Sequence, residues 1–367
     1  MKNEKKIQKI ALLVSCASVL QAAEFLVPSP IPGVKLGLAN IITLIVLADM
    51  GFIPALEIAI LRTVVSSLFL GTFLSPTFIM SLSGALTSTL LMGLTFRYLG
   101  FISTSVLGSV VHVLTQLLVV YILIIRHPGV FVLMPWLGAS AVVMGWLTGA
   151  VAMNVYARIK DGAVTDLLPA AEGLRKITRR AQFSGPAMTK IIIAVLLCVL
   201  VLLLSDLRLY ALVFVLLLAV TATLKTPVSK IFSGVIRMRI FLFFSLAIPA
   251  LFSQGGIEIF SFWFIKVTRA GLMTGTLFSF RLILLMMTTA LLSASTPAEE
   301  LAGSLRKIIG ERLSGIVLIA WDNIPLFWER SRLYIKQHKF DKTIFKKALP
   351  VAINLVALLY AETEKAR

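Results

Sequence analysis

The sequence predicts an all-α polytopic membrane protein, and three observations support this prediction. Charged residues make up 14% of the 367-residue chain and hydrophobic residues 58%, with a mean hydropathy of +0.96. No charged residue occurs between Arg62 and Arg97, between Arg97 and Arg126, or between Arg126 and Arg158. Each of these runs exceeds the ~20 apolar residues that a membrane-spanning helix needs. The runs also lack the alternation typical of barrel strands, so helices must satisfy their backbone in lipid.

A polar stretch, 159–187, separates two hydrophobic blocks, residues 1–158 and 188–367. In the first block we expect six spans, and in the second block four. An even count in each block places the basic N-terminus and the basic linker on the cytoplasmic side of the inner membrane, with both chain termini cytoplasmic. The expected spans lie at about 7–27, 36–50, 52–71, 76–97, 104–125 and 134–157, and at about 190–205, 209–224, 240–253 and 271–293.

The net charge of +18 does not predict nucleic-acid binding. The Lys and Arg residues flank apolar segments, which the positive-inside rule and anionic cytoplasmic lipid explain. Cys16 and Cys198 lie in apolar runs far apart in sequence, so no disulfide framework or metal site follows. The basic N-terminus precedes an apolar run without a small-residue cleavage site, so we expect a retained first span.

After Pro297 the pattern changes to amphipathic helices. Apolar residues recur there at spacings of three to five, interleaved with charges, and predict a first helix up to about residue 320. Further helices are expected at about 322–338 and 348–365, on the cytoplasmic surface. They are either interfacial helices or a docking surface for a soluble partner, and we favour docking because Pro325, Leu326 and Phe327 interrupt the charges instead of leaving a uniformly cationic face.

The sequence contains no conventional catalytic motif, and we expect no enzyme activity and no cofactor in this chain. Without a Gly-Lys dipeptide there is no phosphate-binding Walker loop. No two aspartates are adjacent, so the magnesium-binding aspartate pairs of prenyl-diphosphate enzymes are missing. His112, His127 and His338 lack metal-ligand spacing.

Ionisable residues inside the first block are the better candidates, because a charge at membrane depth is costly unless it is paired or hydrated. For Glu24 and Arg62 the alternative is a structural role, as the pairs Glu24–Lys35 and Glu57–Arg62. Arg281 in the tenth span is either an interhelical tie, which we favour, or part of transport. The candidate substrate-binding residues are Glu24, Lys35, Asn40, Arg62, His112 and Gln116.

Two segments of the chain resemble known families. Residues Pro32-Gly-Val-Lys-Leu-Gly-Leu-Ala-Asn-Ile-Ile-Thr-Leu44 resemble the signature of the Gx transporter family, also labelled heptaprenyl diphosphate synthase component I. That family is similar to the six-helix substrate-binding (S) components of energy-coupling factor (ECF) transporters. Residues 188–367 resemble the transmembrane T component, through Arg281, Ser293–Leu301 and Asn323–Glu329. The resemblance implies a six-helix S-like bundle followed by a four-helix T-like domain with cytoplasmic coupling helices at about 297–365.

In T components the coupling helices end in Ala-Arg-Gly-like motifs that insert into ABC ATPase subunits. Here the corresponding positions hold Gln337-His338-Lys339 and Ala366-Arg367, which keep positive charge but not the full motif. The resemblance therefore implies cytoplasmic ATPase partners, with ATP bound on those partners. The implied contact residues are Glu329, Arg332, His338, Lys339, Ala366 and Arg367.

The leading hypothesis is a membrane subunit of an ECF-type importer that captures a small molecule with its first half and couples to separate ATPases with its second. The alternative is a membrane accessory subunit of isoprenoid or quinone metabolism without a catalytic site of its own. A third interpretation is a membrane scaffold without a transport role. Co-purified ATPases would favour the first, and a soluble prenyltransferase subunit the second.

Overall fold

The chain is a multi-pass helical membrane protein. The computed structural model describes residues 2–26, 37–161, 185–224, 226–253, 257–262, 265–337 and 344–365. Within these ranges, six helical segments have the length and composition to cross a membrane. They are Glu4–Glu24, Phe52–Leu70, Pro76–Ile125, Pro128–Lys160, Pro186–Leu203 and Arg269–Ser295.

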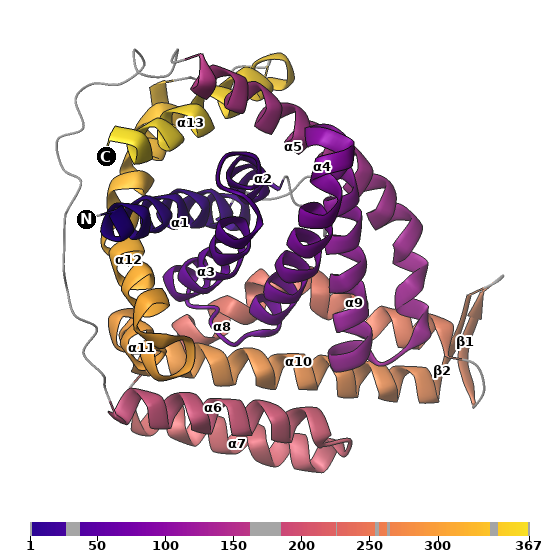
Figure 1. Cartoon of the computed structure of the whole chain (residues 1–367). Helices are drawn as coiled ribbons and strands as arrows, with labels where there is room; N and C mark the ends of the chain where they lie inside the picture. The colour runs from indigo at the N-terminus through magenta and orange to yellow at the C-terminus, as the bar shows by residue number, and fades with distance from the viewer. Residues whose placement is uncertain are drawn as a thin grey trace.

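The N-terminal half contains helices α1 to α5 (Figure 1). Turn residues set several of the helix ends: Gly51 separates α2 from α3, and Ser75 caps α4 by accepting a hydrogen bond from the backbone N–H of Phe78. A π-helix, Val120–Ile125, and a 3₁₀-helix, Pro128–Leu133, link α4 to α5. The helices are α1 (Lys2–Leu26), α2 (Leu38–Met50), α3 (Phe52–Leu70), α4 (Pro76–Val119) and α5 (Met134–Lys160).

Helix α4 consists of two arms that meet at Gly100. Gly100 has φ 69° and ψ −167°, a conformation open mainly to glycine. The arms fold back on each other, with the hydroxyl oxygens of Thr87 and Thr115 2.8 Å apart and the rings of Phe96 and Phe101 in edge contact. The spans expected at 76–97 and 104–125 correspond to these two arms.

The C-terminal half contains α6 to α13 and one small hairpin. Exposed apolar side chains such as Leu196 and Leu203 on α6 and Leu212 on α7 give these helices a face suited to lipid. The antiparallel hairpin of β1 (Glu258–Phe262) and β2 (Ile265–Thr268) is an addition to the all-α architecture that the sequence predicts. The helices are α6 (Gly185–Leu203), α7 (Leu207–Thr223), α8 (Val228–Arg237), α9 (Arg239–Phe252), α10 (Arg269–Ser295), α11 (Ala298–Ser304), α12 (Arg306–Gln337) and α13 (Ile344–Lys365).

The expected break between helices near residue 321 is wrong. Helix α12 runs from Arg306 to Gln337 through Pro325, and the chain bends earlier, at Leu305 and at Gly310, where φ is 83°. A proline inside a helix removes one backbone donor but does not always end the helix. Gly310 takes the backbone out of helical geometry, and the bend therefore falls there.

Helix α1 lies inside a ring of helices to which both halves of the chain contribute (Figure 1). Its apolar side chains, for example Ile10 and Leu13, are fully buried. One side of α1 packs on α3, and another packs on α12, where Ser15 Oγ donates a hydrogen bond to the carbonyl oxygen of Ala320 at 3.0 Å. The C-terminal half therefore forms one wall around the first helix of the N-terminal half.

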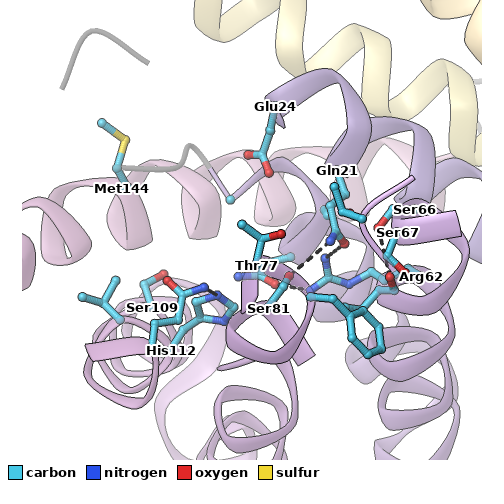
Figure 2. A pocket seen from close by; sticks show the side chains of 18 of the residues that line it. Gln21, Glu24, Arg62, Ser66, Ser67, Thr77, Ser81, Ser109, His112 and Met144 are labelled. Atoms are coloured by element: carbon cyan, nitrogen blue, oxygen red, sulfur yellow. Dashed lines mark hydrogen bonds between the residues drawn. The ribbon is translucent and has the colours of Figure 1, made fainter. Parts of the chain in front are cut away.

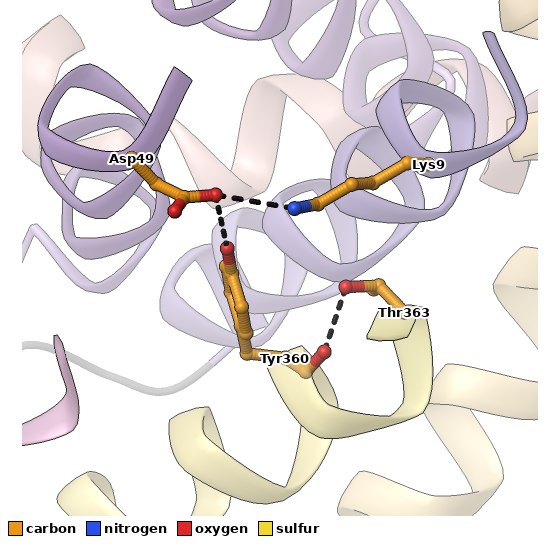
Figure 3. A network of polar contacts seen from close by, with 4 residues as sticks. All are labelled: Lys9, Asp49, Tyr360 and Thr363. Carbon is orange, nitrogen blue, oxygen red and sulfur yellow. Dashed lines mark hydrogen bonds and ion pairs between the residues drawn. The ribbon is translucent and has the colours of Figure 1, made fainter. Parts of the chain in front are cut away.

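Polar contacts tie helices α12 and α13 to the N-terminal half. Arg312 on α12 forms an ion pair with Glu57 on α3 at 3.0 Å, so the alternative pairing of Glu57 with Arg62 is wrong. On α13, Tyr360 donates to Asp49 Oδ2 at 3.3 Å, and the same carboxylate oxygen accepts from Lys9 Nζ at 3.1 Å (Figure 3). These contacts join residues that are far apart in sequence.

Candidate functional site

The N-terminal half encloses a polar cavity of about 100 Å³ (Figure 2). A buried water needs roughly 10–15 Å³ in this measure, so the space suits several waters or one small molecule. Helices α1 to α5 all contribute to the wall. Among the lining residues are Gln21, Glu24, Gly37, Asn40, Arg62, Ser66, Ser67, Thr72, Thr77, Phe78, Ser81, Ser109, His112, Gln116, Ser140 and Met144.

Five of the six candidate substrate-binding residues line this one cavity: Glu24, Asn40, Arg62, His112 and Gln116. They come from four different helices, which no periodicity argument could have brought together. The sixth, Lys35, lies outside the described residues. A role for these residues in substrate binding remains a prediction.

Arg62 is the central cation of the cavity. Its side chain is held by two neutral amides: Nη1 donates to Gln21 Oε1 on α1 at 2.9 Å, and Nη2 donates to Asn40 Oδ1 on α2 at 2.6 Å. Gln21 Nε2 in turn donates to Ser81 Oγ on α4 at 3.2 Å. Arg62 thus lies where four helices meet, with its orientation fixed by side chains from three of them.

The carboxylate of Glu24 is at the end of α1, where the chain leaves the helix. Its Oε1 accepts a hydrogen bond from the backbone N–H of Leu38, at the start of α2, at 2.5 Å. An acceptor at this position satisfies one of the donors left open at a helix N-terminus. Glu24 therefore helps to position α2 while its side chain lines the cavity.

His112 and Gln116 share one face of the second arm of α4, as their spacing of four predicts. The nitrogen Nε2 of His112 lies 3.1 Å from Nε2 of Gln116. The imidazole packs flat on Gly84 of the first arm, where an added Cβ would come within 2.9 Å of the ring. A glycine at 84 is thus what leaves room for the ring beside the cavity.

Among the uncharged polar residues of the site, sequence reasoning found Asn40 and Gln116 but missed the others. It concentrated on ionisable groups and so omitted Gln21 and Ser81, which orient Arg62, and the hydroxyl side chains of the wall. A usable signal was present, because Gln21 is a polar residue in an otherwise apolar span and lies three residues before Glu24. A polar side chain inside an apolar helix therefore indicates a buried site as a charge does.

A second cavity of about 260 Å³ lies between the two halves. Leu70 and Thr72 line both cavities, and α10 contributes Ser293, whose hydroxyl forms no hydrogen bond with any described residue. The second cavity therefore adjoins the first at the end of α3.

Arg281 lies apart from both cavities and is bonded through all three nitrogens. Nε donates to Tyr210 Oη at 3.0 Å, Nη1 to the carbonyl oxygen of Ile124 at 3.3 Å, and Nη2 to that of Leu204 at 3.2 Å. The two carbonyls belong to the ends of the π-helix segment and of α6, which lack helical partners. This geometry favours the interhelical tie over a role in transport.

The candidate partner-binding residues are described only in part. Glu329 and Arg332 are exposed on α12. His338, Lys339, Ala366 and Arg367 lie outside the described residues. Their contact with an ATPase remains a prediction.

Fold and site together define a multi-pass membrane protein whose N-terminal half encloses a small polar cavity and whose C-terminal half packs around that half. Residues 13–155 match the family model described as heptaprenyl diphosphate synthase component I, and residues 180–333 match the one described as cobalt transport protein. The prediction that two such regions are fused in one chain is confirmed.

A curated relative matches part of the chain. It is the energy-coupling factor transporter transmembrane protein EcfT of Lactococcus lactis subsp. cremoris (strain MG1363), 29% identical over 122 residues. The match covers 33% of this chain and 46% of the relative, so the chain spans less than half of that protein's length. No solved structure matches the chain.

Proposed function

We propose that this chain is a membrane subunit of an ECF-type importer, in which residues 1–158 capture a small molecule and residues 188–367 couple that half to separate ATPase subunits. The observation that supports this most directly is the similarity of residues 180–333 to the cobalt transport protein family, together with the match of the chain to the EcfT relative. The cavity of the N-terminal half supplies a place for a transported molecule.

The packing of α12 supports the coupling role. Its buried face, with Ile316, Val317 and Phe327, packs against the first half of the chain, whereas Glu329 and Arg332 are exposed. A helix that packs on the substrate-binding half with one face and exposes charged side chains elsewhere can link that half to a soluble partner. Movement of a partner on the exposed side would reach α1 without passing through a linker.

In this proposal the chain itself is not an enzyme, and ATP binds to the partner subunits. The described residues contain no group of three or more His, Cys, Asp or Glu side chains that is suited to a metal ion. The energy for transport would come from nucleotide hydrolysis on the partners, and the lipid bilayer would surround the apolar faces of the helices.

The family label of residues 13–155 supports a second candidate, a membrane accessory subunit of isoprenoid or quinone metabolism. Because no two aspartates are adjacent anywhere in the chain, it would act there without binding diphosphate through magnesium. The similarity of residues 180–333 to transporter components has no role in this candidate, which is why we prefer the importer.

Purification of the tagged full chain from its own cells in mild detergent separates the two candidates. We expect ABC ATPase subunits among the co-purified proteins, and loss of those subunits in the charge-reversal variant Arg332→Glu. The matched control is Arg97→Glu, an exposed arginine at the far end of the first α4 arm. Recovery of a soluble prenyltransferase subunit without ATPases would contradict the importer and establish the second candidate.

A further inference from the structure

We propose that the cavity binds a small monocarboxylate, with Arg62 as the anchor for its acidic group. The proposal rests on the proposed function, because it names the class of molecule that the substrate-binding half would take. It starts from the fact that the charge of Arg62 lacks a bonded counter-ion within the described part of the chain.

Arg62 is only 4% exposed, and a buried cation at membrane depth is costly without an anion. Two of its five N–H donors are used, and both acceptors are neutral amides. Among the described residues the Nε–H group has no acceptor, and the Glu24 carboxylate in the same cavity interacts with Arg62 electrostatically, without a hydrogen bond or ion pair to it. An anion placed in the cavity would add a bonded counter-charge and could accept hydrogen bonds from the N–H groups of Nη1 and Nη2 that the two amides leave open.

Arg281 shows what a purely structural arginine looks like in the same chain. It is equally buried, yet each of its three nitrogens donates to a protein oxygen. Arg62 differs from it in the open Nε–H donor and in lining a cavity. The difference assigns Arg62 to a site that a ligand completes.

The remaining wall restricts the kind of anion. A planar carboxylate suits the fork of a guanidinium, which favours bidentate binding. Glu24 lines the same cavity, so a second negative group on the ligand would face a carboxylate. Hydroxyl side chains such as Ser66 and Ser109 and the imidazole of His112 can bond a neutral polar group. The several negative charges of a prenyl diphosphate would face the same Glu24 carboxylate, which disfavours it as the ligand.

Matched acids and amides test the proposal on the full chain in lipid nanodiscs. The probes are lactate with lactamide, propionate with propionamide, and benzoate with benzamide, each at millimolar concentration, with the thermal unfolding midpoint and calorimetric binding as readouts. We expect at least one acid to bind and to raise the midpoint while its amide does not. Equal effects of acid and amide, or no effect of any acid, would overturn the proposal.

Variants separate anion binding from folding. Arg62→Gln should weaken binding of the responding acid at least tenfold, and Arg97→Gln, which removes an exposed arginine, should leave it unchanged. Asn40→Asp is the second variant, because it keeps the shape of the side chain and gives Arg62 a permanent counter-ion. The Asn40→Asp variant should leave the fold intact and abolish the preference for the acid over the amide. An unchanged preference in this variant would refute the role of Arg62. Co-purification of ATPase subunits is measured separately, so the proposed importer function is tested independently of anion binding.

Discussion

At the scale of single residues, the two buried arginines Arg62 and Arg281 look alike in sequence, each inside an apolar span. Their surroundings differ: Arg281 closes helix ends, whereas Arg62 is held between amides beside a cavity. Hydropathy finds both residues because their charge interrupts an apolar run. It cannot tell which one is satisfied, since the partners of Arg281 are up to 157 residues away.

If Arg281 is a structural tie, the variant Arg281→Gln should destabilise the fold. It removes donors to the carbonyl oxygens of Ile124 and Leu204, and hydrogen bonds that involve a charged group contribute about 1.5–3 kcal/mol each. We expect a loss of about 3 kcal/mol in SDS-driven unfolding of the purified chain in mixed micelles. The exposed Arg97→Gln variant should change stability by less than about 0.5 kcal/mol. An Arg281→Gln chain as stable as the parent would contradict the tie.

His127, between the π-helix and the 3₁₀-helix, should make stability depend on pH. Burial lowers its pKa below the ordinary value of 6.5, and the neutral ring accepts a hydrogen bond from the N–H of Gly129 at Nδ1, 3.1 Å away. The Nε2 atom lies 3.3 Å from Ser253 Oγ. As the pH falls through 6.5, the unfolded chain binds the proton first, so the stabilisation present above that pH is lost.

The measurement is SDS-driven unfolding at pH 8 and at pH 5. We expect the parent chain to lose stability at pH 5, and the variant His127→Gln to lose less, since it has no titrating ring at this position. The same pH dependence in parent and variant would assign the effect to other groups.

At the scale of elements, glycines with positive φ set the bends that sequence periodicity did not place. Gly310 (φ 83°) and Gly315 lie on the same helix, and an added Cβ would meet nothing within 4 Å at either position. The backbone of Gly310 is unfavourable for any other residue, while that of Gly315 is helical. A comparison of substitutions at Gly310 and Gly315 therefore separates the effect of backbone conformation from the effect of side-chain packing.

We expect Gly310→Ala to destabilise the chain by about 1–3 kcal/mol and Gly315→Ala to stabilise it by up to about 1 kcal/mol. Limited proteolysis around residues 305–312, together with SDS-driven unfolding, measures the effect. If both variants behave alike, the bend at Gly310 is not a conformational requirement of the fold.

The sequence predicted short elements well where glycines bracket them and poorly where contacts are distant. The span expected at 36–50 is α2, Leu38–Met50, because Gly37 and Gly51 bracket it. The helix boundary expected near residue 321 was wrong because the spacing of apolar residues continues across both Pro325 and the bend at Gly310. The pairing of Glu57 with Arg62 was wrong for a related reason: five residues apart on a helix is not one face, and the actual partner, Arg312, is 255 residues away.

The cavity shows the same limit of sequence reasoning. The free-energy cost of a charge at membrane depth identified Glu24 and Arg62 as separate candidates. The spacing of four residues linked His112 with Gln116. Nothing in one sequence brings the end of α1, the middle of α3 and the second arm of α4 to a common point, because that requires the packing of the helices.

At the scale of the whole molecule, helices α12 and α13 hold the two halves together at several places. Besides the contacts of Ser15 and Glu57, Arg158 on α5 donates to Asn354 Oδ1 on α13 at 2.5 Å. Asp49 lies at the centre of the network in Figure 3, between Lys9 and Tyr360, and Lys9 Nζ also lies 5.9 Å from the centroid of the Tyr360 ring. In the proposed importer these contacts would transmit the movement of partners to α1 and α2.

The network around Asp49 should determine how firmly α13 is docked. Asp49→Asn removes the charge that faces Lys9, and we expect it to weaken docking by about 1–3 kcal/mol, whereas Tyr360→Phe, which removes only the hydroxyl, should weaken it by about 0.5–1.5 kcal/mol. Hydrogen exchange of the backbone amides of residues 353–363 measures the docking of α13 directly, with exchange in α7 as the internal control. Because both variants weaken the same Tyr360–Asp49 contact, the double variant should fall short of the sum of the single effects. Additive effects, or α13 exchange unchanged in both variants, would mean that the apolar face of α13 alone holds it against α1 and α5.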